Sequence, residues 1–400
     1  MKIMKVPKEF TVAKPVMEQL ETAGFEAYFV GGSVRDLLLN KPIHDVDIAT
    51  SAYPEEVKGI FPRTVDVGIE HGTVLVLHEE DQYEITTFRT ESTYQDYRRP
   101  DEVTFVRSLE EDLKRRDFTI NALAMSQTGE IVDLFSGMKD LESKLIRAVG
   151  EASERFNEDA LRMMRAVRFA SQLGFTIEEE TLKAIELNKA LLSKISIERV
   201  QIEWVKLLLG HDRKLGLVSF IDTGCYEFCP GFADKKEKLQ LLCDTASVPF
   251  LNEAQAWMLT LCFLEINPGE VKRFLKKWKL SNNLMKRITL ILAALNWRLE
   301  NDWTNEWLFN VGKENASLVE HSMIYFNRPL DVLETEKRYD QLVIKTKQDL
   351  AVDGQMLISA TGKSAGPWLG EMLNDIQLKV LNGDLSNNEA DLLAYASKEC

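Results

Sequence analysis

A short segment near the N-terminus restricts the possible folds more than any other part of this sequence. It is the stretch Tyr28–Ile48, YFVGGSVRDLLLNKPIHDVDI. Its pattern predicts an apolar strand, a glycine pair at Gly31 and Gly32, a short helix, and a second strand that begins at Asp45. Because alternate residues of a strand share a face, the carboxylates of Asp45 and Asp47 are expected to point the same way.

Together, the two halves of this segment indicate a site for a metal ion and a phosphate. Paired carboxylates repel one another unless a cation lies between them. Mg²⁺ suits them because it takes oxygen ligands and leaves positions for phosphate oxygens. A glycine pair lets the backbone approach a phosphate closely. Alone, a glycine pair is more often a turn and an Asp-x-Asp more often a solvated strand end, but their linkage through one short helix favours the chemical interpretation.

Length and composition set the broad class. A chain of 400 residues is too long for one ordinary core, and about two to four domains are expected. The chain is 45% hydrophobic and 28% charged, with no apolar run that could span a bilayer and no signal peptide, so a cytoplasmic protein with no membrane partner is expected. The five scattered cysteines fit a reducing compartment. Cys225 and Cys229 could begin a zinc site, but no second pair follows, and buried thiols are the favoured interpretation.

The charge is uneven along the chain. The net charge of −14 argues mildly against nucleic-acid binding. Yet Val271–Arg287 carries seven basic residues and no acidic one. Such a run is usually a solvated helix face, but the interleaved Phe274 and Trp278 make it a candidate RNA contact.

Further candidates follow the glycine segment. Tyr83–Arg89 alternates like a strand, and Glu84 within it is either a third carboxylate beside the aspartates or an ordinary exposed residue. Thr90–Asp101 is polar and aperiodic, which predicts a mobile loop beside the site. Leu109–Met125 is interpreted as a helix. In this segment Arg116 is a donor for triphosphate or a partner of Asp117, which could accept from a ribose hydroxyl.

From about Gly150 the pattern becomes helical, which predicts a domain boundary. Phe156–Leu173 is expected to be one helix. A polar stripe recurs on it at every third residue: Asp159, Arg162, Arg165 and Arg168. One explanation is a solvated face with a weak ion pair. The other is that three neighbouring arginines repel unless an anion lies among them, which favours a nucleotide-binding ladder.

These motifs, in this order, resemble those of the polymerase-β-like nucleotidyltransferases. GGSVRD followed by HDVDIAT, the run RRDFTINA at Arg115–Ala122, and the EDxxR pattern that ends at Arg162 resemble class II of that superfamily, the bacterial-type tRNA nucleotidyltransferases, which include CCA-adding enzymes and poly(A) polymerases. The resemblance implies an α+β fold: a head with a mixed sheet at 1–149, then an all-α neck at 150–210, body at 211–300 and tRNA-binding tail at 301–400.

The resemblance also implies a reaction. CMP, CMP and AMP would be added in turn from CTP and ATP to the 3′ end of tRNA, with no nucleic-acid template. The family pattern gives Asp45 and Asp47 two Mg²⁺ ions and makes Asp159 and Arg162 a protein template for the base. Cytosine and adenine present an amine beside an acceptor, whereas uracil and guanine present the reverse. The expected contacts with the rest of the nucleotide are Gly31, Gly32, Arg35, Arg116, Asp117, Arg165 and Arg168.

Three rivals remain at this stage. A poly(A) polymerase typically has a basic Gly-Arg-Arg-Phe run where this chain has Gly68–Thr73, GIEHGT. A partial enzyme would add only CC or only A, and CC-adding relatives tend to lack a loop like Thr90–Asp101. A non-catalytic RNA-binding protein is disfavoured by the intact Asp45 and Asp47. The sequence leaves open whether the chain works as a homodimer.

Overall fold

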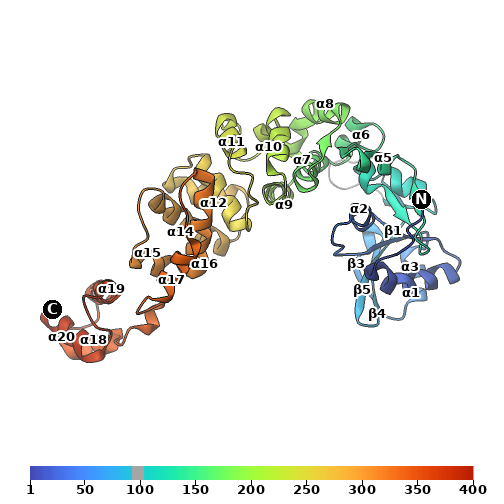
Figure 1. Cartoon of the computed structure of the whole chain (residues 1–400). Coiled ribbons are helices and arrows are strands. Elements are labelled where there is room, and N and C mark those ends of the chain that lie inside the picture. Colours follow the sequence, from blue (N-terminus) through green and yellow to red (C-terminus); the bar gives the residue numbers. More distant parts are fainter. Residues whose placement is uncertain (92–102, 400) are drawn as a thin grey trace. The chain divides into compact units, whose positions relative to one another are not determined.

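The structure, a computed structural model, describes residues 1–91 and 103–399. The chain forms two compact units, Met1–Cys243 and Asp244–Cys400. The first unit contains a mixed sheet followed by helices, and the second is helical, as the predicted α+β fold requires (Figure 1). The expected boundaries at 149, 210 and 300 remain predictions.

The sheet of the first unit has seven strands in the order β3-β4-β5-β2-β1-β8-β9. All its neighbours are antiparallel except β2 and β5, which run parallel. Its strands are β1 (Ala27–Val30), β2 (Asp47–Thr50), β3 (Thr64–Gly68), β4 (Thr73–His78), β5 (Asp81–Thr87), β8 (Leu123–Met125) and β9 (Ile131–Asp133). A separate ribbon pairs β6 (Arg89–Glu91) with β7 (Val103–Phe105).

The two faces of the sheet pack differently, as strand alternation requires. On one face Phe29 of β1 meets Phe10 of α1 (Lys8–Thr22), with ring centroids 4.9 Å apart. Helix α1 also contacts α3 (Pro54–Ile60), and both lie beside the strands in Figure 1. On the other face Val30 and Ala49 pack with Leu113 of α4 (Leu109–Lys114). Asp47 pairs with Val30 in the register, so it belongs to this second face.

The predicted helix over Leu109–Met125 is wrong beyond Lys114. Helix α4 stops there, a 3-10 turn (η2) spans Thr119–Asn121, and β8 follows directly. The apolar residues behind that prediction are buried in the core, Leu123 and Ala124 in β8 and Phe118 and Ile120 before it. Tertiary packing overrides the local pattern here.

The rest of the first unit consists mainly of helices. Helix α7 packs against α9 and α10, which places the centre of this bundle on α7. The elements are α2 (Gly32–Leu38), η1 (Ile69–His71), α5 (Gly137–Glu142), β10 (Leu145–Ile146), α6 (Ala152–Glu158), α7 (Leu161–Leu173), β11 (Thr176–Ile177), α8 (Glu179–Asn188), η3 (Lys189–Lys194), α9 (Ile197–Leu208), α10 (Arg213–Asp222), η4 (Cys225–Phe228) and α11 (Lys236–Cys243).

The second unit is helical throughout its described residues. Its elements are α12 (Glu253–Phe263), η5 (Pro268–Glu270), α13 (Val271–Lys277), α14 (Asn282–Arg298), α15 (Asn305–Val311), α16 (Lys313–Ser322), η6 (Met323–Phe326), α17 (Val332–Asp340), η7 (Lys347–Asp349), α18 (Gly354–Thr361), α19 (Pro367–Asn382) and α20 (Glu389–Glu399). Trp257 and Trp278 meet edge to face in its core, with centroids 5.0 Å apart. Trp278 is therefore buried, and so is Phe274. The proposed RNA contact through these two aromatic side chains is wrong.

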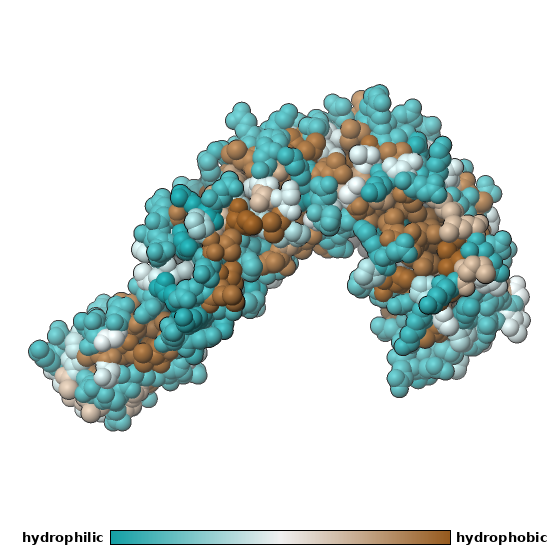
Figure 2. All heavy atoms as spheres, in the orientation of Figure 1, coloured by the Kyte–Doolittle hydropathy of each residue, from teal (hydrophilic) through white to brown (hydrophobic). Residues whose placement is uncertain are grey.

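The surface and the buried cysteines agree with the composition. Hydrophilic residues cover most of the face shown in Figure 2, and apolar residues reach it in separate areas. Within the described ranges, no helix is both long and apolar enough to cross a membrane. Cys225 and Cys229 are buried free thiols, as predicted, and burial raises the pKa of Cys225 to about 12.

Candidate active site

A strongly basic pocket of about 760 Å³ lies in the first unit, between the sheet domain and helices α7 and α9. Its lining contains nine basic side chains but only three carboxylates. The basic residues are Arg35, Arg89, Arg115, Arg116, Arg162, Arg165, Arg168, Arg199 and Lys206, and the acidic ones are Asp47, Asp117 and Asp159. In a chain with a net charge of −14, this concentration of positive charge favours a polyanionic ligand.

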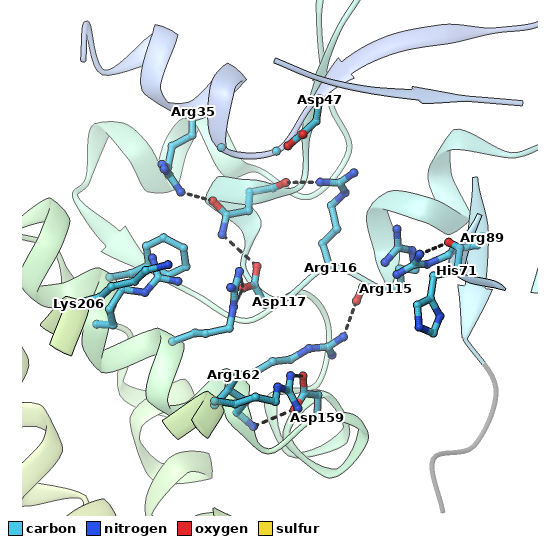
Figure 3. A pocket seen from close by; sticks show the side chains of 18 residues that line it. Arg35, Asp47, His71, Arg89, Arg115, Arg116, Asp117, Asp159, Arg162 and Lys206 are labelled. Carbon is cyan, nitrogen blue, oxygen red and sulfur yellow. Dashed lines mark hydrogen bonds and ion pairs between the residues drawn. The ribbon is translucent and has the colours of Figure 1, made fainter. Parts of the chain in front are cut away.

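The carboxylate end of the pocket is marked by Asp47 of β2, and Glu84 of the neighbouring strand β5 is not part of the lining. In Figure 3, Asp47 stands at one end of the pocket, and Asp159 and Arg162 stand at the other. Strand β2 lies parallel to β5 with Ile48 opposite Ile85, so the preceding residues Asp47 and Glu84 are neighbours on one face. The strand adjacency on which the prediction for Glu84 depended is therefore present.

Asp45 lies outside the strand. The predicted strand start at Asp45 is wrong, because β2 begins at Asp47. Both aspartates are exposed, but only Asp47 is part of the pocket lining. The two aspartates therefore do not project from one strand. They remain coupled electrostatically, because the charge of Asp45 helps to raise the pKa of Asp47.

The charges around Asp47 fit a divalent cation. Partial desolvation raises the pKa of its carboxyl group, Glu84 and Asp45 raise it further, and Arg116 opposes them. In residues 1–91 and 103–399, no three His, Cys, Asp or Glu side chains come together as a ready-made metal site. The donor set still suits a hard cation, since Asp47 and Glu84 supply oxygen ligands and a cation would relieve their repulsion.

Gly31 and Arg116 are fitted to one another. Gly31 has φ +73°, in the region that side chains disfavour, and it leads into α2. A Cβ at this position would lie 3.1 Å from Nη1 of Arg116. The Nε of Arg116 is buried and has no hydrogen-bond partner among the described residues. At Gly32 a Cβ would make only an ordinary contact, 3.7 Å from Nη2 of Arg35.

A chain of hydrogen bonds connects α2 to α7 through the floor of the pocket. Arg35 donates to Oδ1 of Asn121 at 2.7 Å, and Nδ2 of Asn121 donates to Oδ1 of Asp117 at 3.0 Å. Oδ2 of Asp117 accepts from Nε of Arg165 at 2.6 Å. Burial alone would raise the pKa of Asp117, but Arg165, Asn121 and Arg162 outweigh it and hold that pKa well below its usual range.

The predicted single helix over Phe156–Leu173 is wrong, because it is broken before the arginines. Helix α6 ends at Glu158 and α7 begins at Leu161, with Asp159 extended between them. Asn157 therefore lies inside α6, although the predicted helix began beside it at Phe156. The carboxylate of Asp159 accepts from the backbone N–H of Leu161 at 3.0 Å. This break turns Asp159 into the pocket.

The pairing of the arginines corrects the repulsion argument. Each arginine of α7 that lines the pocket has a protein carboxylate beside it, so no bound phosphate is needed to keep the three together. The pairs are Arg162 with Glu158 at 2.6 Å, Arg165 with Asp117 at 2.5 Å and Arg168 with Glu203 at 2.8 Å. The ring of Phe169 lies under the guanidinium of Arg168, 3.5 Å from its Cζ.

Helix α9 supplies residues that the sequence interpretation missed. Arg199 donates from Nη2 to Asp159 at 2.6 Å and from Nη1 at 3.3 Å, and Glu203 accepts from Arg168. Because Arg199 and Glu203 are four residues apart, their spacing predicts an ion pair along the helix surface. The strongly apolar sequence around Trp204 indicates a buried helix, and this was the one sign that Arg199 and Glu203 face the protein interior. Other missed lining residues are His71, Arg89, Arg115, Asn121, Phe169 and Lys206.

One predicted element cannot be compared. The proposed loop over Thr90–Asp101 falls, from residue 92 onward, outside the described residues. His211-Asp212 lies at a helix start, where Asp212 caps α10 by accepting from the N–H of Leu215 at 3.1 Å. The segment after Thr361 connects α18 and α19.

Comparison with known protein families divides the chain in the same order. Residues 27–147 match the family model of the poly A polymerase head domain. Residues 174–236 match a probable RNA and SrmB binding site of polymerase A, and residues 248–396 match a putative domain 2 of tRNA nucleotidyltransferases. Together with the sheet and the basic pocket, these matches define the class as a nucleotidyltransferase with a polymerase-type head.

Whole-chain relatives narrow this class. The CCA-adding enzyme of Enterococcus faecalis is 55% identical over 399 residues, covering 100% of this chain and 98% of the relative. That of Pediococcus pentosaceus is 50% identical, covering 98% of this chain and 99% of the relative. The crystal structure of the Bacillus stearothermophilus CCA-adding enzyme in complex with CTP matches with a TM-score of 0.91 and 43% identity, covering 98% of both chains. The chain belongs to the family of CCA-adding enzymes.

Proposed function

We propose that this protein adds CCA to the 3′ end of tRNA, using CTP and ATP and no nucleic-acid template. The observation that carries the proposal is the pocket, which joins Asp47 of the sheet to the Asp159–Arg162 pair of the helical part. The full-length similarity to CCA-adding enzymes supports the same reaction, and it does not favour a poly(A) polymerase or a partial enzyme.

The carboxylate end would carry the chemistry. Nucleotidyltransferases of this class use divalent metal ions, and here we assign Mg²⁺ to Asp45 and Asp47, with Glu84 as the third carboxylate. When bound, the metal lowers the pKa of the primer hydroxyl and neutralises the leaving pyrophosphate. The side chains of the protein orient the substrate. Arg116 lines the pocket and would contact the sugar–phosphate part, and Gly31 leaves space for its guanidinium.

The triphosphate would lie against the floor of the pocket. We assign its contacts to the backbone at Gly32 and to Arg35, which lines the pocket while it holds Asn121. Asp117 keeps both oxygens engaged with Asn121 and Arg165, so its first role is to fix Arg165, and a ribose hydroxyl would be a further partner.

The opposite end would select the base. In this structure Asp159 is bound by Arg199, and Arg162 is bound by Glu158 and by the carbonyl oxygens of Arg155 and Arg115. An incoming base must therefore compete with protein partners for the Asp159–Arg162 pair. Cytosine and adenine can replace them, because each offers an amine to Asp159 and an acceptor to Arg162. Uracil and guanine leave both groups unpaired, which is costly in a buried site. Arg165 and Arg168 would contact the same nucleotide.

The proposal places the protein in the cytoplasm with tRNA, CTP and ATP as partners. The test incubates it with Mg²⁺ and a tRNA that lacks its three terminal nucleotides. CTP alone should extend the tRNA by two nucleotides, ATP alone should not extend it, and both together should extend it by three. An unlimited ladder of A additions would contradict the proposal, because it would indicate a poly(A) polymerase.

A further inference from the structure

One aromatic side chain in the pocket has no part in the function proposed above. Phe169 lies on α7, lines the pocket and is only 4% exposed. Three guanidinium groups lie over its ring, and their Cζ atoms are 3.5 Å (Arg168), 5.1 Å (Arg35) and 5.4 Å (Arg165) from the ring centroid. Arg165 and Arg168 belong to α7, whereas Arg35 belongs to α2. The ring therefore contacts arginines from two elements that are far apart in the sequence.

The three distances are those of cation–π contacts. The face of an aromatic ring is negative and attracts a cation that lies within about 6 Å of the ring centroid. The attraction is stronger where water is excluded, and Arg35 and Arg168 are both buried. All three arginines line the nucleotide pocket. Filling the core requires only an apolar side chain such as leucine, so the gathering of three arginines on this ring indicates a further role.

Stacking on the ring leaves the hydrogen-bonding edge of Arg168 available. The donors of a guanidinium lie in its plane, so a ring that covers its flat face does not block them. Nε of Arg168 donates to Glu203 at 2.8 Å and Nη1 donates to Gln172 at 2.9 Å, whereas no described residue accepts from Nη2. The ring therefore contacts the flat face of Arg168 while part of the edge can still donate to a nucleotide oxygen.

The ring itself is fixed, and the charges that gather on it repel one another. Phe118 is fully buried and meets Phe169 edge to face, with centroids 5.8 Å apart and planes at 86°. Burial lowers the pKa of Arg168, Glu203 opposes this change, and the charge of Arg165 lowers the pKa further. A ring face that attracts both guanidiniums offsets part of the repulsion between Arg165 and Arg168.

We propose that Phe169 is a positioning residue whose ring holds Arg35, Arg165 and Arg168 where an incoming CTP or ATP meets them. The inference rests on the proposed function, which assigns these arginines to the nucleotide. The ring acts through the arginines and not on the base, so the choice among nucleotides stays with the Asp159–Arg162 pair. Arginines that are already in place lose less freedom when the nucleotide binds, so loss of the ring face should appear mainly as a higher KM for CTP.

A graded change in the charge of the ring tests this with little change in its size. Phenylalanines with one, two or three fluorine atoms are incorporated at position 169, since each fluorine withdraws electron density from the ring face. Calorimetry measures CTP binding, and thermal unfolding verifies the fold. The Kd for CTP should rise with each fluorine and be about fivefold higher with three, while the preference for CTP over UTP stays as in the wild type.

Phe10 provides the matched control, because it is a buried ring of the same unit that meets Phe29 edge to face and does not line the pocket. The trifluorinated residue at position 10 should leave CTP binding unchanged. Phe169→Leu and Phe10→Leu should both lower the unfolding temperature, but only Phe169→Leu should raise KM for CTP, by at least about fivefold and with a smaller change in kcat.

The outcomes separate the inference from the proposed function. If the wild type adds CCA and the Kd for CTP stays constant or falls along the fluorine series, the ring only fills the core or stacks on the base, and the inference is overturned alone. The same holds if Phe169→Leu keeps the wild-type KM for CTP. If the wild type neither binds CTP nor extends tRNA, the proposed function fails and the inference fails with it.

Discussion

Asp117 and Arg165 tie the sheet domain to the helix that carries the arginines. Oδ2 of Asp117 lies 2.6 Å from Nε and 2.5 Å from Nη2 of Arg165. The two residues are 48 positions apart, and Asp117 is buried while Arg165 is half-buried. Their ion pair couples the positions of the two ends of the pocket.

Replacing Asp117 by Asn should therefore destabilise the first unit. The partly exposed guanidinium of Arg165 would lose its carboxylate partner, and the loss of a hydrogen bond to a charged group costs about 1.5 to 3 kcal/mol. The folded-state pKa of Asp117 is lowered, so its contribution is present above the unfolded value near 4 and declines as the pH falls below that. Urea unfolding at pH 7 and pH 3 measures this. The difference between wild type and variant should be large at pH 7 and smaller at pH 3, and equal stabilities at pH 7 would contradict the account.

The second prediction concerns Asp47. Asp47→Asn should reduce nucleotide addition at least about a hundredfold, because a metal ligand beside the reacting phosphate is lost. It should not destabilise the fold, because the folded state disfavours the ionised carboxylate. Asp66→Asn is the matched control, since Asp66 is an exposed aspartate on β3 of the same sheet. Full activity of Asp47→Asn in a single-turnover assay would remove Asp47 from the metal site.

The third prediction compares Gly31, which has a positive φ and lies beside Arg116, with Gly59, which lies in a helix. Gly31→Ala should cost about 1 to 2 kcal/mol because of its positive φ, and it should weaken triphosphate binding by displacing Arg116. Gly59→Ala is the control: Gly59 lies in α3 with open space around it, so alanine there should be neutral or stabilising. CTP titration by calorimetry and thermal unfolding report the two effects. Unchanged CTP affinity in Gly31→Ala would indicate that Arg116 does not contact the nucleotide.

A fourth prediction follows from the pair formed by Asp159 and Arg199. Arg199→Ala should leave Asp159 without its bidentate partner and lower the preference for CTP over UTP by roughly tenfold. Arg199→Lys should recover part of that preference, because lysine keeps the positive charge but cannot donate two parallel hydrogen bonds to the carboxylate. A purely structural role would change stability and leave the CTP to UTP ratio as it is. The ratio of kcat/KM for the two nucleotides is the deciding measurement.

Much of this site could be predicted from the sequence, because most residues of the proposed metal-binding end come from one short segment of the chain. The glycine pair, the short helix and Asp47 lie within one segment whose pattern determines its own geometry. Even there the strand start was misplaced by two residues, which left Asp45 outside the strand. Glu84 needed one tertiary fact, the parallel pairing of β2 and β5.

The end of the pocket that would select the base could not be predicted in full, because the residues that pair with its arginines and with Asp159 come from other helices and strands. Nothing in the spacing of Arg168 indicates that Glu203, 35 residues away, will face it. The helix break at Asp159 is also invisible to a three-residue periodicity. Likewise Phe274 and Trp278 read as surface aromatics beside lysines, whereas core packing with Trp257 buries Trp278.

The central claim is that Asp47 supplies the chemistry and the Asp159–Arg162 pair chooses the nucleotide. Its most direct test measures single-turnover addition of CTP and UTP to tRNA lacking CCA, in the wild type and in Asp159→Ala. The wild type should prefer CTP by about a hundredfold or more, as two matched hydrogen bonds imply, and the variant should lose most of that preference while it still adds nucleotides. A variant that keeps the full wild-type preference, or a wild type that uses UTP as readily as CTP, would contradict the account.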